Sequence, residues 1–401
     1  MRSEMMPDEA LRSEQLPPWP FYGPAERAAV DAVLASGKVN YWTGSESRQF
    51  EEEYARYLGV EHAIALANGT VALELPLRMW NIGSGDEVIV TPRSFIASTS
   101  CAVAVGARPV FADVDRDSGN ITAETIARVL TPRTRAIIPV HLAGWPCDMA
   151  AIMALAAGRD IKVLEDCAQA HGAAYNGKPV GSLGDAAAFS FCQDKIISTG
   201  GEGGLLATRD AALWESAWAF KDHGKTWESV YRRPHRPGFR WVHERFGTNW
   251  RLTEPQSAIG RIQLRRLDQW VEQRRGNAAI LTQRLRALAA LRIPDVPPRF
   301  YHAYYKFYAY VRPQALRAAW SRDRLLAAIV DRGVPCFSGS CPEIYREHAF
   351  QNTGWAPPDA LPVAAELGET SLMFLVHPTI EEHHLHRLCD VVESVIRQAT
   401  A

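Results

Sequence analysis

Lys195 lies in a sequence setting that suits carbonyl chemistry. Ser190 precedes it by five positions, and the glycine-rich stretch 200–204 follows it. Asp166 closes a stretch that begins with the apolar run 161–164, which predicts a buried strand. A lysine amine forms a Schiff base with an aldehyde, a carboxylate pairs with a pyridinium nitrogen, and a serine hydroxyl hydrogen-bonds a phosphate. Together the three side chains predict a site for pyridoxal 5'-phosphate (PLP).

The tripeptide Asn68, Gly69 and Thr70 lies between a predicted strand and a helical stretch. Backbone N–H groups at the N-terminus of a helix bind phosphate, and a glycine allows the phosphate to approach closely. On its own such a tripeptide is most often a turn. Beside Ser190 it predicts a cup for the cofactor phosphate.

Three further side chains are candidates for the same site. Phe95 is either a ring that stacks on the cofactor or a residue of the hydrophobic core. Gln169 is expected to pack beside the cofactor ring or its O3′ group. Glu202, inside the glycine-rich stretch, either shapes the turn or meets the substrate from a neighbouring subunit.

Short apolar stretches alternate with helical ones along the first half of the chain, which predicts a mostly parallel α/β sheet. The helical pattern begins with residues 24–36 and 50–58. The strands are expected at 62–66, 87–90, 109–111, 136–140, 161–164, 186–190 and 204–207. Ligands of such sheets bind beyond the carboxyl ends of the strands. Asn68, Asp166 and Ser190 all fall at such ends, so we expect one shared site.

A long, charged helical pattern runs from Leu252 to about Leu291 and predicts a bridge into a second domain. A chain of 401 residues exceeds one ordinary domain. We therefore expect an N-terminal arm over residues 1–22, a large cofactor-binding domain over 23–276 and a smaller C-terminal domain over 277–401.

Composition excludes several classes of protein. The net charge of −1 gives no general attraction to nucleic acid or to an acidic membrane. The seven cysteines are scattered and form no CxxC pair, so neither a metal site nor a disulfide framework is predicted. Residues 1–18 have no apolar core of a signal peptide, and no apolar run is long enough to span a bilayer. A reducing, cytoplasmic location is the simplest expectation.

The segment 224–251 is irregular, basic and aromatic. Arginine forks match phosphate oxygens, so Arg232, Arg233, Arg236 and Arg240 are candidates for binding a diphosphate. A solvated surface loop that carries ordinary interface arginines explains the same composition.

With these motifs in place, the chain resembles the DegT-type nucleotide-sugar aminotransferases, which are PLP enzymes of the aspartate aminotransferase (type I) fold. The resemblance runs nearly end to end. It rests on the stretches 36–37 with 50–51, 68–70, 165–172, 181–195, 201–204, 248–251 and 361–362. The fold that it implies is α/β, with a large, mostly parallel-sheet cofactor domain and a smaller C-terminal α/β domain.

The resemblance also implies roles for single residues. Lys195 is the Schiff-base lysine, Asp166 holds the ring nitrogen, and Phe95 stacks on the ring. The phosphate is held by Gly69, Thr70 and Ser190. Asn249 reaches the phosphate of the cofactor in a partner subunit, which implies a homodimer with shared active sites.

By this resemblance the protein moves an amino group from an amino acid, L-glutamate, to a nucleotide-linked keto-sugar, with pyridoxamine phosphate as the intermediate carrier. A UDP-linked 4-keto-6-deoxy sugar of capsule or glycan biosynthesis is favoured. A PLP-dependent sugar dehydratase is an alternative, although relatives with that chemistry have histidine in place of Lys195. A non-enzymatic regulatory protein is another. The family pattern is not kept at Trp250, at 192–194 or at 337–340, which leaves the sugar open.

Overall fold

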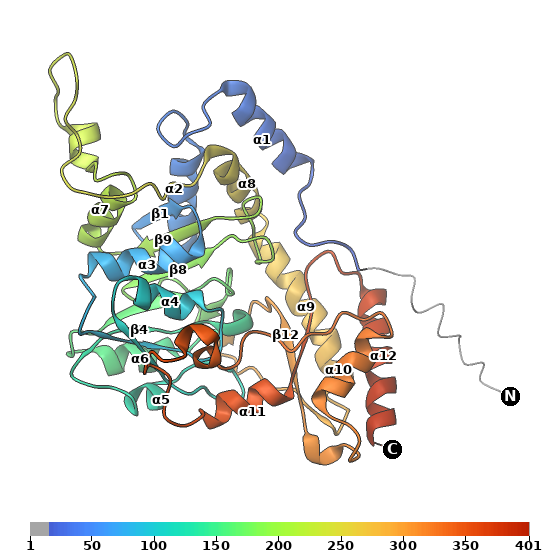
Figure 1. Ribbon diagram of the computed structural model, residues 1–401. Helices are drawn as coiled ribbons and strands as arrows, with labels where there is room; N and C mark the ends of the chain where they lie inside the picture. The colour runs from blue at the N-terminus through green and yellow to red at the C-terminus, as the bar shows by residue number, and fades with distance from the viewer. Residues whose placement is uncertain (1–15, 401) are drawn as a thin grey trace.

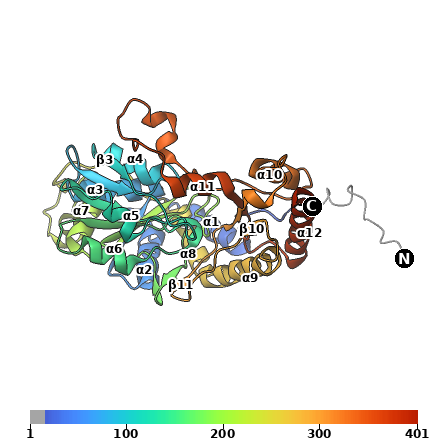
Figure 2. The same cartoon turned by 90° about the horizontal axis from the view of Figure 1, so that it is seen from below.

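The structure is a computed structural model that describes residues 16–400. Residues 1–15 of the expected N-terminal arm lie outside the described residues, and so does most of the segment 1–18, in which no signal peptide is predicted. A large sheet covered by helices forms one part of the molecule, and a smaller sheet with α9, α10 and α12 forms the other (Figures 1 and 2). Among residues 16–400, no helix is both long and apolar enough to cross a bilayer.

The large sheet contains all seven predicted strands. They are β1 (His62–Leu66), β2 (Glu87–Val90), β3 (Arg108–Phe111), β4 (Thr134–Ile138), β5 (Lys162–Asp166), β8 (Ala186–Ser190) and β9 (Gly204–Thr208). Their order is β1-β9-β8-β5-β4-β2-β3. Only β9 runs antiparallel to its neighbours, while the pairs from β8 to β3 are parallel. The α/β class with a mostly parallel sheet is confirmed, and the carboxyl ends of six strands meet at one edge.

Helices bury both faces of this sheet, which is why its strands are apolar runs and not alternating patterns. The chain forms α1 (Pro24–Ser36), α2 (Glu46–Leu58), α3 (Gly69–Met79), α4 (Ala97–Ala104), α5 (Ala123–Ala127), α6 (Met149–Ala156) and α7 (Ala211–Phe220). Helices α3, α4 and α7 share one core with Ile64 and Leu66 of β1. Ala63 and Ala65 point to the other face, where α2 packs. Helices α5 and α6 cover that other face beside β2, β4 and β5.

The helical stretch after Leu252 is two helices and not one. They are α8 (Glu254–Leu264) and α9 (Leu267–Leu285), and the break falls at the arginine pair 265–266. Helix α9 begins in the core of the large sheet with Leu267 and ends in a separate core with Leu281 and Leu285. It therefore runs unbroken through residue 276, where the domain boundary is expected, and that boundary stays a prediction.

The C-terminal part contains a second, antiparallel sheet. It is built from β10 (Leu291–Arg292), β12 (Phe307–Val311) and β13 (Ser371–Phe374), and is packed by α10 (Arg322–Val330), α11 (Pro362–Thr370) and α12 (Glu382–Thr400). Strands β6 (Ala174–Tyr175), β7 (Lys178–Pro179) and β11 (Phe300–Tyr301) form a third, small sheet.

One C-terminal segment returns to the large sheet. Ile344, Tyr345 and Phe350 join the core of β1, α3 and α4, and the rings of Tyr345 and Phe350 pack on Phe111 of β3. The Ile344 N–H donates to the carbonyl of Pro92 at 2.8 Å. Because of this return, one side of the space beyond the sheet edge is closed by residues from the last quarter of the chain.

Candidate active site

A cavity of about 990 Å³ opens at the carboxyl edge of the large sheet. Eight of the predicted site residues line it: Gly69, Thr70, Phe95, Asp166, Gln169, Ser190, Lys195 and Glu202. The opposite wall comes from Tyr305 and Lys306 just before β12, from the 337–341 loop and from residues in and just after β13. The strand-end argument predicts that these residues lie close together, and the structure brings all eight into one cavity.

The phosphate cup is built where β1 passes into α3. Asn68 caps the helix, because its side-chain oxygen accepts the N–H of Val71 at 3.0 Å. The N–H groups of Gly69 and Thr70 belong to the first turn, which has no acceptors within the helix. A Cβ atom at position 69 would lie 2.6 Å from the Cβ of Ser190, so only glycine allows the serine to come this close. These groups fit a phosphate dianion.

Asp166 ends β5 with its carboxylate buried at the cavity wall. One oxygen accepts the hydroxyl of Ser98 at 2.7 Å and the other accepts the N–H of Ala168 at 3.0 Å. Burial raises the pKa of Asp166, although these two hydrogen bonds and the charge of Lys195 oppose the shift. A protonated pyridine nitrogen would supply the missing cation here.

Lys195 reaches the cavity from the turn after β8. Its Nζ lies 3.4 Å from Asp194 and 3.4 Å from the hydroxyl of Tyr305, which also donates to Asp194. The indole N–H of Trp19 donates to the Lys195 carbonyl at 2.8 Å. The lysine is thus held at its backbone by the N-terminal segment and at its amine by the C-terminal one.

The remaining cavity residues suit a flat ring. The Gln169 amide is fixed, because its oxygen accepts the N–H of Ala143 at 2.8 Å. The ring of Phe95 is 68% exposed, which leaves it free to stack and argues against a core role. Glu202 is exposed, and its backbone carbonyl accepts the side chain of Gln256 at 2.8 Å. The phosphate cup, the buried carboxylate and the lysine together fit PLP.

His171 supports the cup without entering it. Its two ring nitrogens lie 2.7 Å from the Tyr54 hydroxyl and 2.8 Å from the Ser190 carbonyl. Burial lowers the pKa of His171 to about 3, so the ring is neutral. Its contact with the Ser190 carbonyl fixes the backbone of the cup.

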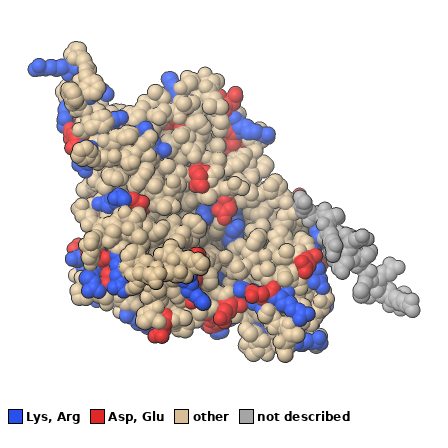
Figure 3. All heavy atoms as spheres, in the orientation of Figure 1, with Lys and Arg blue, Asp and Glu red and all other residues tan. Residues whose placement is uncertain are grey.

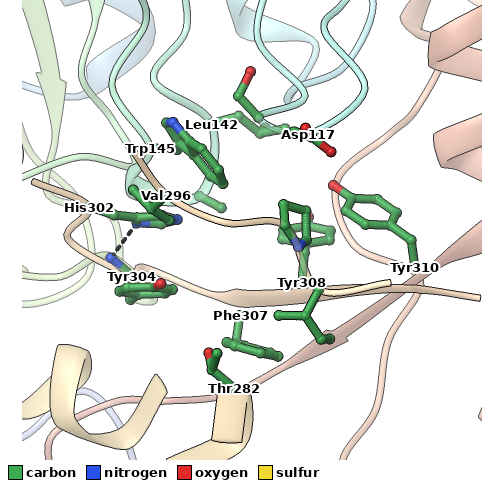
Figure 4. A pocket seen from close by; sticks show the side chains of 14 residues that line it. Asp117, Leu142, Trp145, Thr282, Val296, His302, Tyr304, Phe307, Tyr308 and Tyr310 are labelled. Atoms are coloured by element: carbon green, nitrogen blue, oxygen red, sulfur yellow. Dashed lines mark hydrogen bonds between the residues drawn. The ribbon is translucent and has the colours of Figure 1, made fainter. Parts of the chain in front are cut away.

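Two other features of the interior are too small or too well bonded to be the site. The cavity in Figure 4, beside Trp145, Tyr304 and Tyr308, measures about 30 Å³, which is room for little more than one water. The ligand atoms of His141, Glu165 and Cys167 lie within 4.8 Å of one another. However, the Glu165 carboxylate already accepts three backbone N–H groups between residues 181 and 184 and contacts His141 at 3.0 Å, so Glu165 anchors that turn.

Five predicted residues lie away from the cavity of their own chain. Asn249 is exposed, and so are Arg232, Arg233, Arg236 and Arg240. The four arginines belong to a projecting segment, residues 225–247, which extends beside α7 in Figure 1 and carries basic side chains at its end in Figure 3.

Three residues of the cavity were not predicted from the sequence. Ser98 holds the carboxylate of Asp166, Tyr305 contacts Lys195, and Lys306 lines the same wall. Tyr305 is 110 positions away from Lys195 along the chain, and no local pattern reports such a contact. Ser98 could have been suspected, because it follows Phe95 by three positions at the start of a helix.

Comparison with known proteins identifies the family. The chain is 35% identical over 372 residues to the UDP-N-acetyl-3-dehydro-alpha-D-glucosamine 3-aminotransferase of Acidithiobacillus ferrooxidans, which covers 91% of this chain and 94% of that protein. It is 34% identical to the dTDP-3-amino-3,4,6-trideoxy-alpha-D-glucose transaminase of Streptomyces venezuelae, over 91% of this chain and 90% of that one.

The X-ray structure of an aminotransferase from Psychrobacter cryohalolentis superposes with a TM-score of 0.94 at 52% identity, covering 96% of this chain and all of that one. Residues 22–393 match the model of one protein family. The chain therefore belongs to the DegT/DnrJ/EryC1/StrS aminotransferase family.

Proposed function

We propose that this PLP-dependent aminotransferase moves an amino group from L-glutamate to a nucleotide-linked keto-sugar, for the synthesis of an amino sugar of a capsule or other glycan. The observation that carries the proposal is the position of the Lys195 amine, which lies in one large cavity with the phosphate cup and the Asp166 carboxylate. The cavity of about 990 Å³ has room for a sugar beside the cofactor.

Within that class we favour a UDP-linked 4-keto-6-deoxy sugar as acceptor. Phe337, Met373 and Leu375 make part of the cavity wall apolar, and a 6-deoxy methyl group suits such a wall. One relative is named for a UDP-linked sugar and the other for a dTDP-linked one. Both names specify amination at C3, so the 3-keto isomer is the second acceptor to test.

The chain's own residues divide the chemistry. When bound, PLP supplies a ring that accepts the electron pair released at the donor carbon. Asp166 holds the proton on the ring nitrogen. The Lys195 amine carries a proton between Cα of the donor and C4′ of the cofactor, and the same amine serves the return half of the cycle. Gly69, Thr70 and Ser190 hold the phosphate in both halves.

The alternatives are a sugar dehydratase and a regulatory protein without activity. Neither alternative requires a lysine amine at position 195 in the same cavity as the Asp166 carboxylate. A dehydratase would release water and leave no amino group on the sugar, whereas a transaminase forms one 2-oxoglutarate for each amino sugar.

We further propose a homodimer with shared active sites in the reducing cytoplasm. Asn249 is exposed outside its own cavity, and Phe239, Trp241 and Phe246 on or beside the projecting segment are 76%, 83% and 101% exposed. A second copy that covers these rings would remove them from water. None of the seven cysteines is paired, which suits a reducing compartment.

The test follows the two halves separately. Glutamate should bleach the yellow enzyme and yield 2-oxoglutarate, and the correct nucleotide keto-sugar should restore the colour and yield an amino sugar. UDP-, dTDP- and GDP-linked 4-keto and 3-keto sugars form the panel. Lys195→Ala is the control and should be inactive in both halves. An enzyme that glutamate does not bleach, or that no keto-sugar recolours, contradicts the proposal.

A further inference from the structure

The cavity wall opposite α3 carries a second lysine. Lys306 lies one residue before β12, and its Nζ is 4.7 Å from the centroid of the Tyr305 ring. The Nζ of Lys195 is 5.0 Å from the same ring. Both lysines line the cavity, so a second ammonium group lies beside the same aromatic ring as the reacting amine.

This wall has more positive than negative charge. Among the described residues, Asp194 is the carboxylate that acts on Lys306, and it is already engaged by Lys195 at 3.4 Å and by the Tyr305 hydroxyl. No carboxylate of the described residues forms an ion pair with Lys306. Behind it, the fully buried Arg274 donates one hydrogen bond to the Tyr305 carbonyl at 3.2 Å, and two of its nitrogens have no hydrogen-bond partner. Three cations therefore face one carboxylate.

An anion of the substrate would balance this charge. The phosphate of bound PLP would lie in the cup at the N-terminus of α3, on the opposite side of the cavity, and would not do so. The α-carboxylate of an amino-acid donor is two bonds away from the donor nitrogen, which takes the place of the Lys195 amine. The diphosphate of a nucleotide sugar lies a whole sugar ring away from the reacting carbon. The geometry favours the carboxylate.

We propose that Lys306, with Arg274 behind it, binds the α-carboxylate of the amino donor. This inference rests on the proposed aminotransferase function and adds the group that recognises the donor. The two cations act differently: the Lys306 ammonium contacts the carboxylate, and the buried guanidinium adds to the positive potential of the wall.

The protonation of Lys306 gives the inference a pH signature. Burial is the main cause that lowers the pKa of Lys306 to about 8; Arg274 and Lys195 add to the shift and Asp194 opposes it. The groups that face it are Asp194, Lys195, Tyr305, Arg274 and the neutral ring of His377, whose pKa burial lowers to about 3. A lysine binds a carboxylate strongly only while it is charged. The affinity for the donor should therefore be highest well below pH 8 and fall as the pH rises through 8.

The test measures equilibrium binding and needs no turnover. 2-Methylglutamate carries an α-carboxylate but has no Cα proton to lose, and its binding changes the absorbance of the bound cofactor. Lys306→Met should weaken this binding by about ten- to a hundredfold, the range of a charge-assisted hydrogen bond. Lys306→Arg should restore much of it. Lys178→Met, an exposed lysine on β7 outside the cavity, is the matched control and should bind as the wild type does.

Three further ligands distinguish binding of the α-carboxylate from binding of the distal carboxylate and of the nucleotide. 2-Aminoisobutyrate has only the α-carboxylate and should lose affinity in Lys306→Met, whereas 4-aminobutyrate, which lacks it, should not. UDP binding, measured by calorimetry, should stay unchanged. Unchanged binding of both α-carboxylate ligands, an equal loss with 4-aminobutyrate, or a loss confined to UDP would each overturn the inference.

A pH titration keeps the test decisive if Lys306→Met fails to hold the cofactor. The affinity of the wild type for 2-methylglutamate should decline above about pH 8 relative to Lys306→Arg, because a guanidinium stays charged. Identical pH profiles of the two proteins would overturn the inference. A failed sugar assignment would affect only the UDP measurement, because the amino-acid ligands and the pH profiles involve no nucleotide.

Discussion

Asp166 is held by neutral donors alone, the Ser98 hydroxyl and the Ala168 N–H. Both hydrogen bonds fix the direction of the carboxylate without neutralising it. Its position at the end of β5 leaves it buried at the cavity wall, where it would face the ring nitrogen of bound PLP. The residue therefore acts through its negative charge, and a neutral side chain of the same shape would not replace it.

Asp166→Asn separates charge from shape. The amide fills the same space, so PLP should remain bound, but the ring nitrogen loses its charge partner. We expect the glutamate half-reaction to slow by about a hundredfold or more, as for the loss of one electrostatic stabiliser in other enzymes. Single-turnover bleaching measures it, with Asp331→Asn on the surface as control. Equal rates for mutant and wild type would refute this role.

Arg93 is a second buried charged residue, and it has no assigned role in the cavity. It is 0% exposed, its three side-chain nitrogens have no hydrogen-bond partner among the described residues, and its guanidinium lies 5.3 Å from the centroid of the Tyr308 ring. Removing an unpaired buried charge in favour of an apolar side chain of similar length is expected to stabilise a protein.

Arg93→Met should therefore unfold at the same or a higher urea concentration than the wild type. Arg322→Met is the matched control. Arg322 donates to the carbonyls of Gly368 and Ser371 at 2.9 and 2.8 Å, so its loss should lower stability. Destabilisation by Arg93→Met would mean that this guanidinium has an anionic partner.

Among the elements, the projecting segment 225–247 extends away from the large sheet beside α7 (Figure 1). Its four candidate arginines are not equivalent. Arg232 and Arg233 already pair with Glu228 at 3.8 Å and Glu244 at 2.7 Å, whereas Arg236 and Arg240 form no ion pair within the described residues. If this segment binds the sugar diphosphate, the second pair has its charge available.

Charge reversal of Arg236 and Arg240 to glutamate should weaken the keto-sugar half-reaction about tenfold or more, since phosphate binding by arginine is charge-assisted. Bleaching by glutamate should stay normal. Reversal of Arg232 and Arg233 gives the comparison, with a smaller effect on the sugar and a loss of the two internal ion pairs. Equal losses in both half-reactions would indicate damage to the fold, and no loss would remove the segment from the mechanism.

The elements also show how far the sequence alone could be used. Apolar runs predicted all seven strands, and strand ends predicted Asp166 and Ser190 as neighbours, because parallel strands share an edge. The direction of β9 could not be predicted, since an apolar run is the same in both orientations. Tyr305 and Lys306 could not be placed either, because only the packing of the C-terminal part brings them to Lys195.

At the scale of the whole molecule, the proposed dimer makes a prediction that no monomer can satisfy. Lys195→Ala and Asn249→Asp should each be inactive, because one loses the amine and the other adds a negative charge at the phosphate. Mixed and refolded together, they should regain about a quarter of the wild-type activity, because half of the dimers are mixed and each has one intact site of two. Sedimentation checks the dimer itself; a fully active monomer would contradict it.

The return of the C-terminal segment to the sheet edge has a consequence for synthesis on the ribosome. The phosphate cup, Asp166 and Lys195 are made early, but Lys306, the 337–341 loop and Leu375 complete the cavity much later. At roughly 5–20 residues per second, the ribosome needs on the order of ten to forty seconds for the stretch from Lys195 to Leu375. Throughout that interval the nascent chain carries the reactive amine without the wall that encloses it. Stable capture of the cofactor is therefore a late event, close to or after release of the finished chain.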